Sequence, residues 1–362
     1  DAMGNVDEGT AGGDVDANVA IGYAALYGGD FAGNDRQLNG NVAIGYGAMD
    51  STGANAQTGT IAIGHSALTA LTSGDSNVAI GYTALSAISS GAGNVALGHN
   101  ALAAAGVGES KNIAIGHNAM SLMDEGEGAN ADGNIAIGFE AIKGHDKGTN
   151  SGNINNNIGI GTRALGSASF GAGDTVVQEG SIGIGYYALN ALTSGAGNTA
   201  VGYLAMAENT TGLGNTVLGY GAMYRSGGSN PADSDHNTFI GYLSGSGDWS
   251  AGGDVKNEYN VCVGSTTMGS SLNGANNNVG LGYGCLNNTT TGDGNTVAGY
   301  TAGTSITAGA NNVCLGTSAG DSITTANKCV LIGRNTGAAV TVTNTSNVSD
   351  GTVAVGDNAL TA

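Results

Sequence analysis

Proline, aromatic residues and charged residues are all scarce in this sequence. One Pro stands among 362 residues, and aromatic side chains make up 5% of the chain. Charged residues make up 10%, against about 25% in an ordinary globular domain. A single Pro without a triplet period excludes a collagen helix. The low charge and the steady content of β-branched residues do not fit intrinsic disorder.

Basic residues are the scarcest charged class. The chain has 9 Lys and Arg against 28 Asp and Glu, and its formal net charge is -19. Such a chain repels nucleic acid and anionic membranes, so we exclude both as partners. No apolar stretch approaches the roughly 18 residues of a membrane span, and the first residues do not resemble a signal peptide. The acidic excess serves solubility or attracts Ca²⁺, and composition does not separate the two.

Glycine is abundant instead, with 68 residues, which disfavours helices by about 1 kcal/mol per interior site. The glycines recur within one phrase, written NVAIGYAAL from Asn18, NVAIGYGAM from Asn41 and NIAIGHNAM from Asn112. We call the central glycine of each copy its anchor. The anchors are Gly22, Gly45, Gly64, Gly81, Gly98, Gly116, Gly138, Gly161, Gly185, Gly202, Gly219, Gly241, Gly264, Gly282, Gly299, Gly316, Gly333 and Gly356.

The intervals between anchors run from 17 to 24 residues. A fixed short unit with insertions of variable length is typical of a solenoid, in which each repeat forms one coil. The sequence therefore predicts an all-β protein, a parallel β-solenoid or β-roll of about 18 coils with a 17-residue minimal repeat. We expect an N-terminal segment over 1–17, solenoid repeats over 18–337 and a degenerate final repeat over 338–362.

Each position within the repeat predicts a structural role. The three residues before the anchor are apolar or small, which predicts a strand buried on both faces. One face lines the coil, and the other needs a partner, so we expect self-association. Four residues before the anchor, Asn stands in fourteen of the eighteen copies, as expected for a turn or a stacked amide ladder. Ala and then Leu or Met, three and four residues after the anchor, predict a second short strand.

The cysteines and most methionines fall on these same positions. Cys262 and Cys314 stand two residues before an anchor, and Cys285 stands three after one, where small residues are usual. Cys329 replaces the Asn of its copy. The spacing of the four Cys fits neither a zinc site nor a disulfide framework. We expect the first three to be small core residues, and the Met that replace Leu to be core as well.

The residue after the anchor is an aromatic residue or a His in most copies, which predicts a column of stacked rings. The column serves as a stacking platform for a glycan or as a structural ladder, and the periodicity favours the ladder. Its members are Tyr23, Tyr46, His65, Tyr82, His99, His117, Phe139, Tyr186, Tyr203, Tyr220, Tyr242, Tyr283 and Tyr300. We expect no metal site there, since no carboxylate stands at ligand spacing.

The NVAIGYGAM-type phrases resemble the head repeats of trimeric autotransporter adhesins and the β-roll repeats of bacteriophage tail fibres. The resemblance covers about Asn18 to Leu360. It implies that each subunit winds a left-handed parallel β-roll and that three subunits pack side by side. It also implies an extracellular or virion-surface protein that attaches to a host.

Recognition residues are expected in the insertions, because solenoid insertions gather on one face. The adjacent insertions Tyr224–His236 and Ser246–Tyr259 contain the only Pro and the only Trp of the chain. They carry Tyr224, Arg225, Pro231, Asp233, Asp235, His236, Asp248, Trp249, Asp254 and Tyr259. Among these, Tyr224, Arg225, His236, Asp248, Trp249 and Tyr259 are the candidate ligand-binding residues, with Trp249 exposed for stacking on a sugar. Packing of Trp249 between loops or subunits is the alternative.

The pattern predicts a protein that is not an enzyme, since no nucleophile elbow, zinc motif or phosphate loop is present. We expect no cofactor, with Ca²⁺ in the acidic loops left open. The predicted function is a structural fibre or adhesin, foremost a phage tail fibre segment that presents a surface for a cell-surface glycan or protein receptor. The alternatives are a self-assembling extracellular filament and a polysaccharide depolymerase on a β-helical scaffold.

Overall fold

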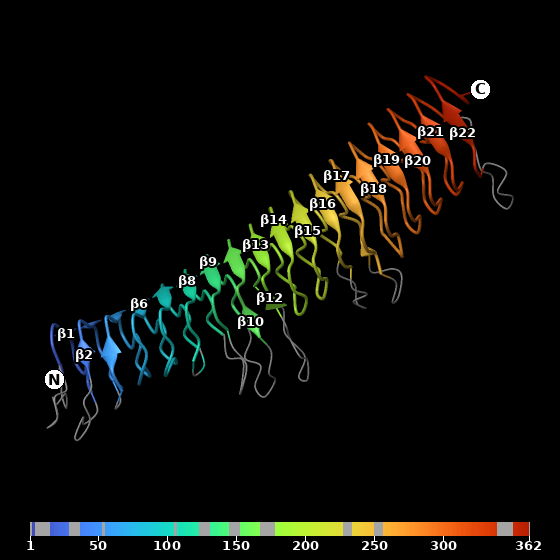
Figure 1. The fold of residues 1–362 in the computed structure, drawn as a ribbon. Coiled ribbons are helices and arrows are strands. Elements are labelled where there is room, and N and C mark those ends of the chain that lie inside the picture. Colours follow the sequence, from blue (N-terminus) through green and yellow to red (C-terminus); the bar gives the residue numbers. More distant parts are fainter. Residues whose placement is uncertain are drawn as a thin grey trace. The chain divides into compact units, whose positions relative to one another are not determined.

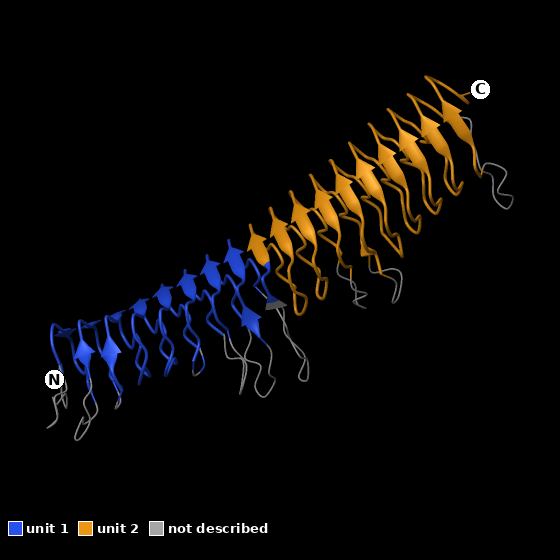
Figure 2. Ribbon diagram, in the orientation of Figure 1, with its two compact units in different colours: residues 1–181 blue, residues 182–362 orange. Residues whose placement is uncertain are grey.

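The protein is a parallel β-solenoid, seen in a computed structural model of the chain (Figure 1). The structure describes residues 2–3, 15–28, 37–52, 55–104, 106, 108–122, 131–144, 153–166, 178–226, 234–249, 256–338 and 350–361. The elements of this part of the chain are all β-strands, with no α-helix among them. The predicted fold class is therefore confirmed. The chain divides into two compact units, Asp1–Ser181 and Ile182–Ala362 (Figure 2).

The main sheet of the first unit is built from the three residues that precede each anchor. Neighbouring strands are parallel and in register, so that Val78 pairs with Val95 and Ile80 with Leu97. The strands are β1 (Val19–Ile21), β3 (Val42–Ile44), β5 (Ile61–Ile63), β6 (Val78–Ile80), β7 (Val95–Leu97), β8 (Ile113–Ile115), β9 (Ile135–Ile137) and β11 (Ile158–Ile160).

The second unit repeats the same arrangement. Its strands are β13 (Ile182–Ile184), β14 (Thr199–Val201), β15 (Thr216–Leu218), β16 (Thr238–Ile240), β17 (Val261–Val263), β18 (Val279–Leu281), β19 (Thr296–Ala298), β20 (Val313–Leu315), β21 (Val330–Ile332) and β22 (Val353–Val355). The last strand lies in the segment predicted as a degenerate repeat, and it pairs with β21 in the same register as the others.

Two short ladders form where the sequence predicted only turns. β2 (Leu38–Asn39) pairs with β4 (Gln57–Thr58), and β10 (Ile154–Asn155) pairs with β12 (Gln178–Glu179). Both ladders begin seven residues before an anchor, and both belong to the first unit.

The core of each coil is narrow and built from small and aliphatic side chains. The middle strand residue points inward, as Ala79 and Ala200 do, and is fully buried. The Ala and Leu three and four residues after the anchor are also buried. They do not form the predicted second strand. They lie in a turn that contains two residues with left-handed backbones, one of which is Leu85 with a φ of +51°. This backbone directs the side chains of both the Ala and the Leu into the core.

A ladder of buried asparagines joins successive coils. The backbone N–H of Asn295 donates to Oδ1 of Asn278 over 3.0 Å, and the Asn295 Nδ2 donates to the carbonyl oxygen of Gly309 over 2.8 Å. Oδ1 of Asn295 then accepts the N–H of Asn312 over 3.0 Å. The predicted amide ladder is confirmed. Its side chains satisfy backbone groups that the short strands leave unpaired.

The anchor glycines lie directly above one another. Gly202, with a φ of +141°, faces the backbone of Gly219 in the next coil so closely that a Cβ would overlap the Gly219 carbonyl oxygen. A side chain at this position is therefore excluded by backbone contact and not by conformation alone. The same contact is found at other anchors, Gly185 and Gly219 among them, and it explains the recurrence of glycine there.

Core volume is exchanged between two positions of the same coil. In one coil Phe239 replaces the inward Ala, and Gly245 replaces the Leu four residues after the anchor. A Cβ on Gly245 would lie 2.6 Å from Cδ1 of Phe239. Leu331 and Gly337 repeat the exchange, with 2.9 Å between the corresponding atoms. The core thus keeps its packing density while its residues change.

The cysteines are part of this core. All four are buried free thiols, which confirms the prediction for Cys262, Cys285 and Cys314. Burial raises the pKa of Cys314 to about 12, and it raises the pKa of Cys262, Cys285 and Cys329 as well. The Met residues that replace Leu, among them Met49 and Met268, are fully buried as predicted.

Candidate functional site

Trp249 is the predicted ligand-binding residue whose placement differs from expectation. Its side chain is 8% exposed and packs against Phe239, with 5.8 Å between ring centroids and 55° between ring planes. The prediction of an exposed tryptophan was therefore wrong. The physical reason is the volume exchange in this coil, because an inward Phe opposite a Gly offers the indole a large apolar surface.

Tyr224 and Arg225 lie beside the backbone of Trp249. The N–H of Trp249 donates to the Arg225 carbonyl oxygen over 3.2 Å. The Arg225 guanidinium carbon lies 6.0 Å from the centroid of the Tyr224 ring, at the limit of a cation–π contact. Arg225 and Asp248 are exposed, while Tyr224 is half-buried. The neighbouring candidates Pro231, Asp233 and Asp254 lie outside the described residues.

His236 and Tyr259 form a stacked pair on the surface of the second unit. Their ring centroids are 5.3 Å apart and their planes differ by 11°. Both residues stand five positions before an anchor and have left-handed backbones, with φ of +57° and +59°. The N–H of Tyr259 donates to the carbonyl oxygen of Asp235 over 3.3 Å. The structure thus brings together two candidate residues that lie in different insertions.

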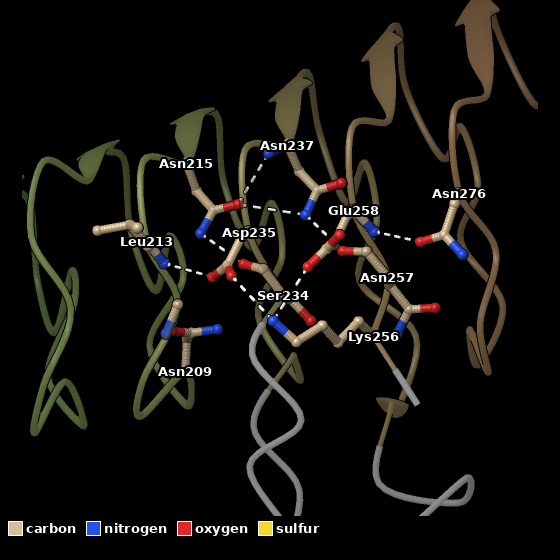
Figure 3. A network of polar contacts seen from close by, with 11 residues as sticks. Asn209, Leu213, Asn215, Ser234, Asp235, Asn237, Lys256, Asn257, Glu258 and Asn276 are labelled. Atoms are coloured by element: carbon tan, nitrogen blue, oxygen red, sulfur yellow. Dashed lines mark hydrogen bonds and ion pairs between the residues drawn. The ribbon is translucent and has the colours of Figure 1, made fainter. Parts of the chain in front are cut away.

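The residues that precede this pair in sequence, Asp235 and Glu258, form a charged cluster with Lys256 (Figure 3). The Lys256 Nζ lies 3.6 Å from Oδ2 of Asp235 and 3.2 Å from Oε1 of Glu258. Both carboxylates are mostly buried, while half of the Lys256 side chain is exposed. Oδ1 of Asp235 also accepts the N–H of Leu213 over 2.8 Å. We call Asp235, His236, Lys256, Glu258 and Tyr259 the edge patch.

The Asp235 carboxylate of the edge patch belongs to a wider pattern that our reading of the sequence missed. Six residues before many anchors, an Asp or Asn accepts the backbone N–H of the preceding coil. Asp75 accepts from Thr58, and Asp132 accepts from Ser110, each over 2.7 Å. The recurrence of Asp or Asn six residues before the anchor is the feature of the sequence from which this pattern could have been predicted. Part of the acidic excess therefore bridges coils.

The aromatic column is a stack of rings in each unit. In the second unit Tyr186, Tyr203 and Tyr220 follow one another with centroids 4.9 and 5.0 Å apart and nearly parallel planes. Each ring covers the face of the next, so these rings present edges to the outside. Sugars stack on ring faces, and the arrangement therefore favours the structural ladder over the glycan platform.

The column runs beside an apolar surface on each unit. The first and third residues of each main strand point away from the core and are partly exposed, among them Leu97 (44%) and Leu218 (47%). We define the outer face of a unit as these two positions together with the residue after the anchor. Across all eighteen copies, only Arg334 and Asp357 at these positions carry a formal charge. The strands were predicted to be buried on both faces, but within one chain only their inward face is buried.

Arg334 and Asp357 neutralise each other across adjacent coils. The Arg334 Nε and Nη2 donate to the two carboxylate oxygens of Asp357 over 2.8 and 2.9 Å. The hydrogen bonds from Arg334 lower the pKa of the exposed Asp357 carboxyl. The two formally charged residues of the outer face therefore form an ion pair with each other.

A second ion-pair cluster lies in the first unit. Oε1 of Glu140 lies 2.9 Å from the Lys143 Nζ, and Oε2 lies 2.6 Å from the Arg163 Nε. Burial acts to raise the pKa of Glu140, but the hydrogen bonds and charges of the two cations outweigh it and hold that pKa below its ordinary value. The cluster ties one coil to the next, and Glu140 is 9% exposed at its side chain.

Within the described ranges, no three His, Cys, Asp or Glu side chains come together as a metal site. No helix in this part of the chain is long and apolar enough to cross a membrane. Comparison with protein-family models, with curated proteins and with solved structures gave no match to this chain.

Proposed function

We propose that this protein is a non-enzymatic fibre or adhesin subunit, of the kind found in phage tail fibres. Copies associate side by side through their outer faces and present a receptor-binding surface outside the cell or on a virion. The observation that carries the proposal is the outer face itself, a strip in each unit that consists mostly of partly exposed Val, Ile, Leu and aromatic side chains. An exposed apolar patch of this kind marks an interaction site.

The occupant of the outer face is a further copy of the same chain. The chain carries a net charge of -19, so most of its surface repels a second copy. The outer face is the exception, because its acidic and basic residues reduce to one ion pair. Two or three such faces bury apolar area without placing like charges together. The number three follows from the resemblance to trimeric β-roll repeats.

Sedimentation with two matched lysine variants tests this association. Leu218 lies on the outer face. Leu213 belongs to the same coil but stands six residues before its anchor, outside the outer face. Their exposed fractions are similar, 47% and 42%. Leu218→Lys should weaken association because it buries a charge at the interface, and Leu213→Lys should leave it unchanged. A discrete trimer of the unmodified chain is expected. A monomer contradicts the proposal, and polymers that grow with concentration favour the filament.

The edge patch is the proposed receptor surface. Tyr259 is 53% exposed and stacked on His236, and the carboxylates of Asp235 and Glu258 lie beside the pair. Aromatic rings with neighbouring carboxylates suit a glycan, through contact of the ring with sugar C–H groups and hydrogen bonds to hydroxyls. Rigid copies on one fibre multiply weak contacts by avidity.

Binding of the intact protein to host cells or to a glycan array tests the patch. Tyr259→Ala should abolish binding, and the exposed Tyr27, which lies outside both the patch and the outer face, supplies the control Tyr27→Ala. Normal binding by the Tyr259→Ala variant removes the patch from the proposal. Release of reducing sugar from a host polysaccharide would support the depolymerase instead.

A further inference from the structure

Three of the five histidines of the chain lie on the outer face of the first unit. His65 stands in the column between Tyr46 and Tyr82, with centroid distances of 5.0 and 5.2 Å. His99 and His117 occupy consecutive coils and stack on each other at 5.0 Å with 12° between their planes. In the second unit, every ring of the column is a Tyr. The two units therefore differ at this position in their ability to gain a proton.

The surroundings of the paired histidines contain no charge to offset a proton. His99 stacks on Tyr82 and His117 on Phe139, with Leu97 and Ile115 in the adjacent strands. The carboxylate that follows Phe139, Glu140, is paired with Lys143 and Arg163. In the described part of the chain, no carboxylate pairs with His65, His99 or His117, and the Nδ1 of His65 contacts the Ser66 hydroxyl over 2.9 Å.

We propose that the outer face of the first unit is a pH-sensitive interface, in which neutral His99 and His117 permit association and their protonation opposes it. The proposal rests on the association of outer faces proposed above. In the free chain, these imidazoles are exposed and water solvates an added proton. In the associated state, an apolar partner covers them, and a charge buried there without a counterion is disfavoured.

The paired arrangement strengthens the effect. Two imidazolium rings at 5.0 Å repel each other, and the repulsion grows when a partner excludes water from between them. Association is therefore favoured when these imidazoles are neutral and weakens as the pH falls. Each His that must stay neutral in the associated state adds to that loss.

Sedimentation of the full chain at about pH 7.5 and about pH 5 tests this interface, since His titrates between those values. The unmodified chain should associate at the higher pH and lose at least about tenfold in its association constant at the lower pH. The circular dichroism spectrum should stay the same, which separates dissociation from unfolding. The variant His65→Tyr/His99→Tyr/His117→Tyr should keep its association at both pH values, because Tyr already occupies this column and does not titrate there.

The outcomes separate the two proposals. A chain that is monomeric at about pH 7.5 overturns the proposed function. Equal association at both pH values overturns the pH-sensitive interface alone, as does a triple variant without His65, His99 and His117 that still dissociates in acid. A photo-crosslinking residue placed at Tyr82 or at Tyr203 locates the change. Intermolecular crosslinks at Tyr82 should fall in acid at least as far as those at Tyr203, and a loss confined to Tyr203 contradicts a role for the histidines.

Discussion

Replacing an anchor glycine with alanine should destabilise the solenoid far more than the same change at another left-handed glycine. Gly202 and Gly197 belong to the same coil and offer this comparison. A Cβ on Gly202 would lie 2.7 Å from the carbonyl carbon of Gly219 and still closer to its oxygen. A Cβ on Gly197, where φ is +69°, would meet no atom within 4 Å. The two variants therefore differ in φ, +141° against +69°, and in the contact with the next coil.

The magnitudes follow from these contacts. Two carbon atoms in ordinary contact are about 3.5 Å apart, so Gly202→Ala forces the coils to separate by several tenths of an ångström. Because each coil is bonded to both neighbours, that displacement breaks strand pairing, and we expect a loss of about 3–5 kcal/mol in the free energy of unfolding. Gly197→Ala carries only the strain of a left-handed alanine, about 1 kcal/mol.

Chemical denaturation followed by circular dichroism, at one protein concentration for all variants, measures the difference. Gly356→Ala adds a second control, because a Cβ at this last anchor would meet only Ala359 at 4.0 Å. Equal losses for Gly202→Ala and Gly356→Ala, whose φ values of +141° and +130° are similar, would refute the reasoning, since they would show that the anchors are needed for their φ and not for close stacking.

Three further predictions concern the ion pairs, the thiols and the core. The pKa of Glu140 is lowered, so the ionised carboxylate stabilises the fold above the ordinary Glu titration range, and this stabilisation is lost as the pH falls through the lowered pKa. Below about pH 5, the free energy of unfolding should therefore fall less steeply with pH in Glu140→Gln than in the unmodified chain. The raised pKa of Cys314 keeps its thiol protonated, and aromatic disulfide reagents should modify it only in denaturant; rapid reaction of the native chain contradicts its burial. Phe239→Ala should cost about 3–5 kcal/mol, and adding Gly245→Leu should recover much of that loss in thermal unfolding.

Much of the fold follows from the repetition alone. A glycine at a fixed place among Val, Ile and Ala located every main strand, and the Asn four residues earlier predicted the ladder. These predictions succeed because each coil obeys the same local rules as its neighbours. The turn at Ala84 and Leu85 was predicted as a strand, since apolar residues in sequence do not show that the backbone alternates in handedness.

The candidate site was less accessible to sequence reasoning. The stacking of His236 on Tyr259 depends on the register between two coils whose insertions differ in length. The role of Asp235 as an acceptor for the preceding coil is visible only once coils are aligned six residues before their anchors. Trp249 was predicted to be exposed because it stands alone in an insertion, yet its partner Phe239 occupies an ordinary core position in the same coil.

The sequence by itself determined that the chain is a β-solenoid, where its strands lie and which residues form its ladders, because periodic contacts leave a periodic pattern. Only the tertiary structure decided which apolar residues stay uncovered. In each strand, the apolar residues on either side of the buried Ala resemble core residues in the sequence. The coil is narrow, however, and it has room for one inward side chain per strand. The others form the outer face, and the burial that they still lack is the physical reason for expecting a partner.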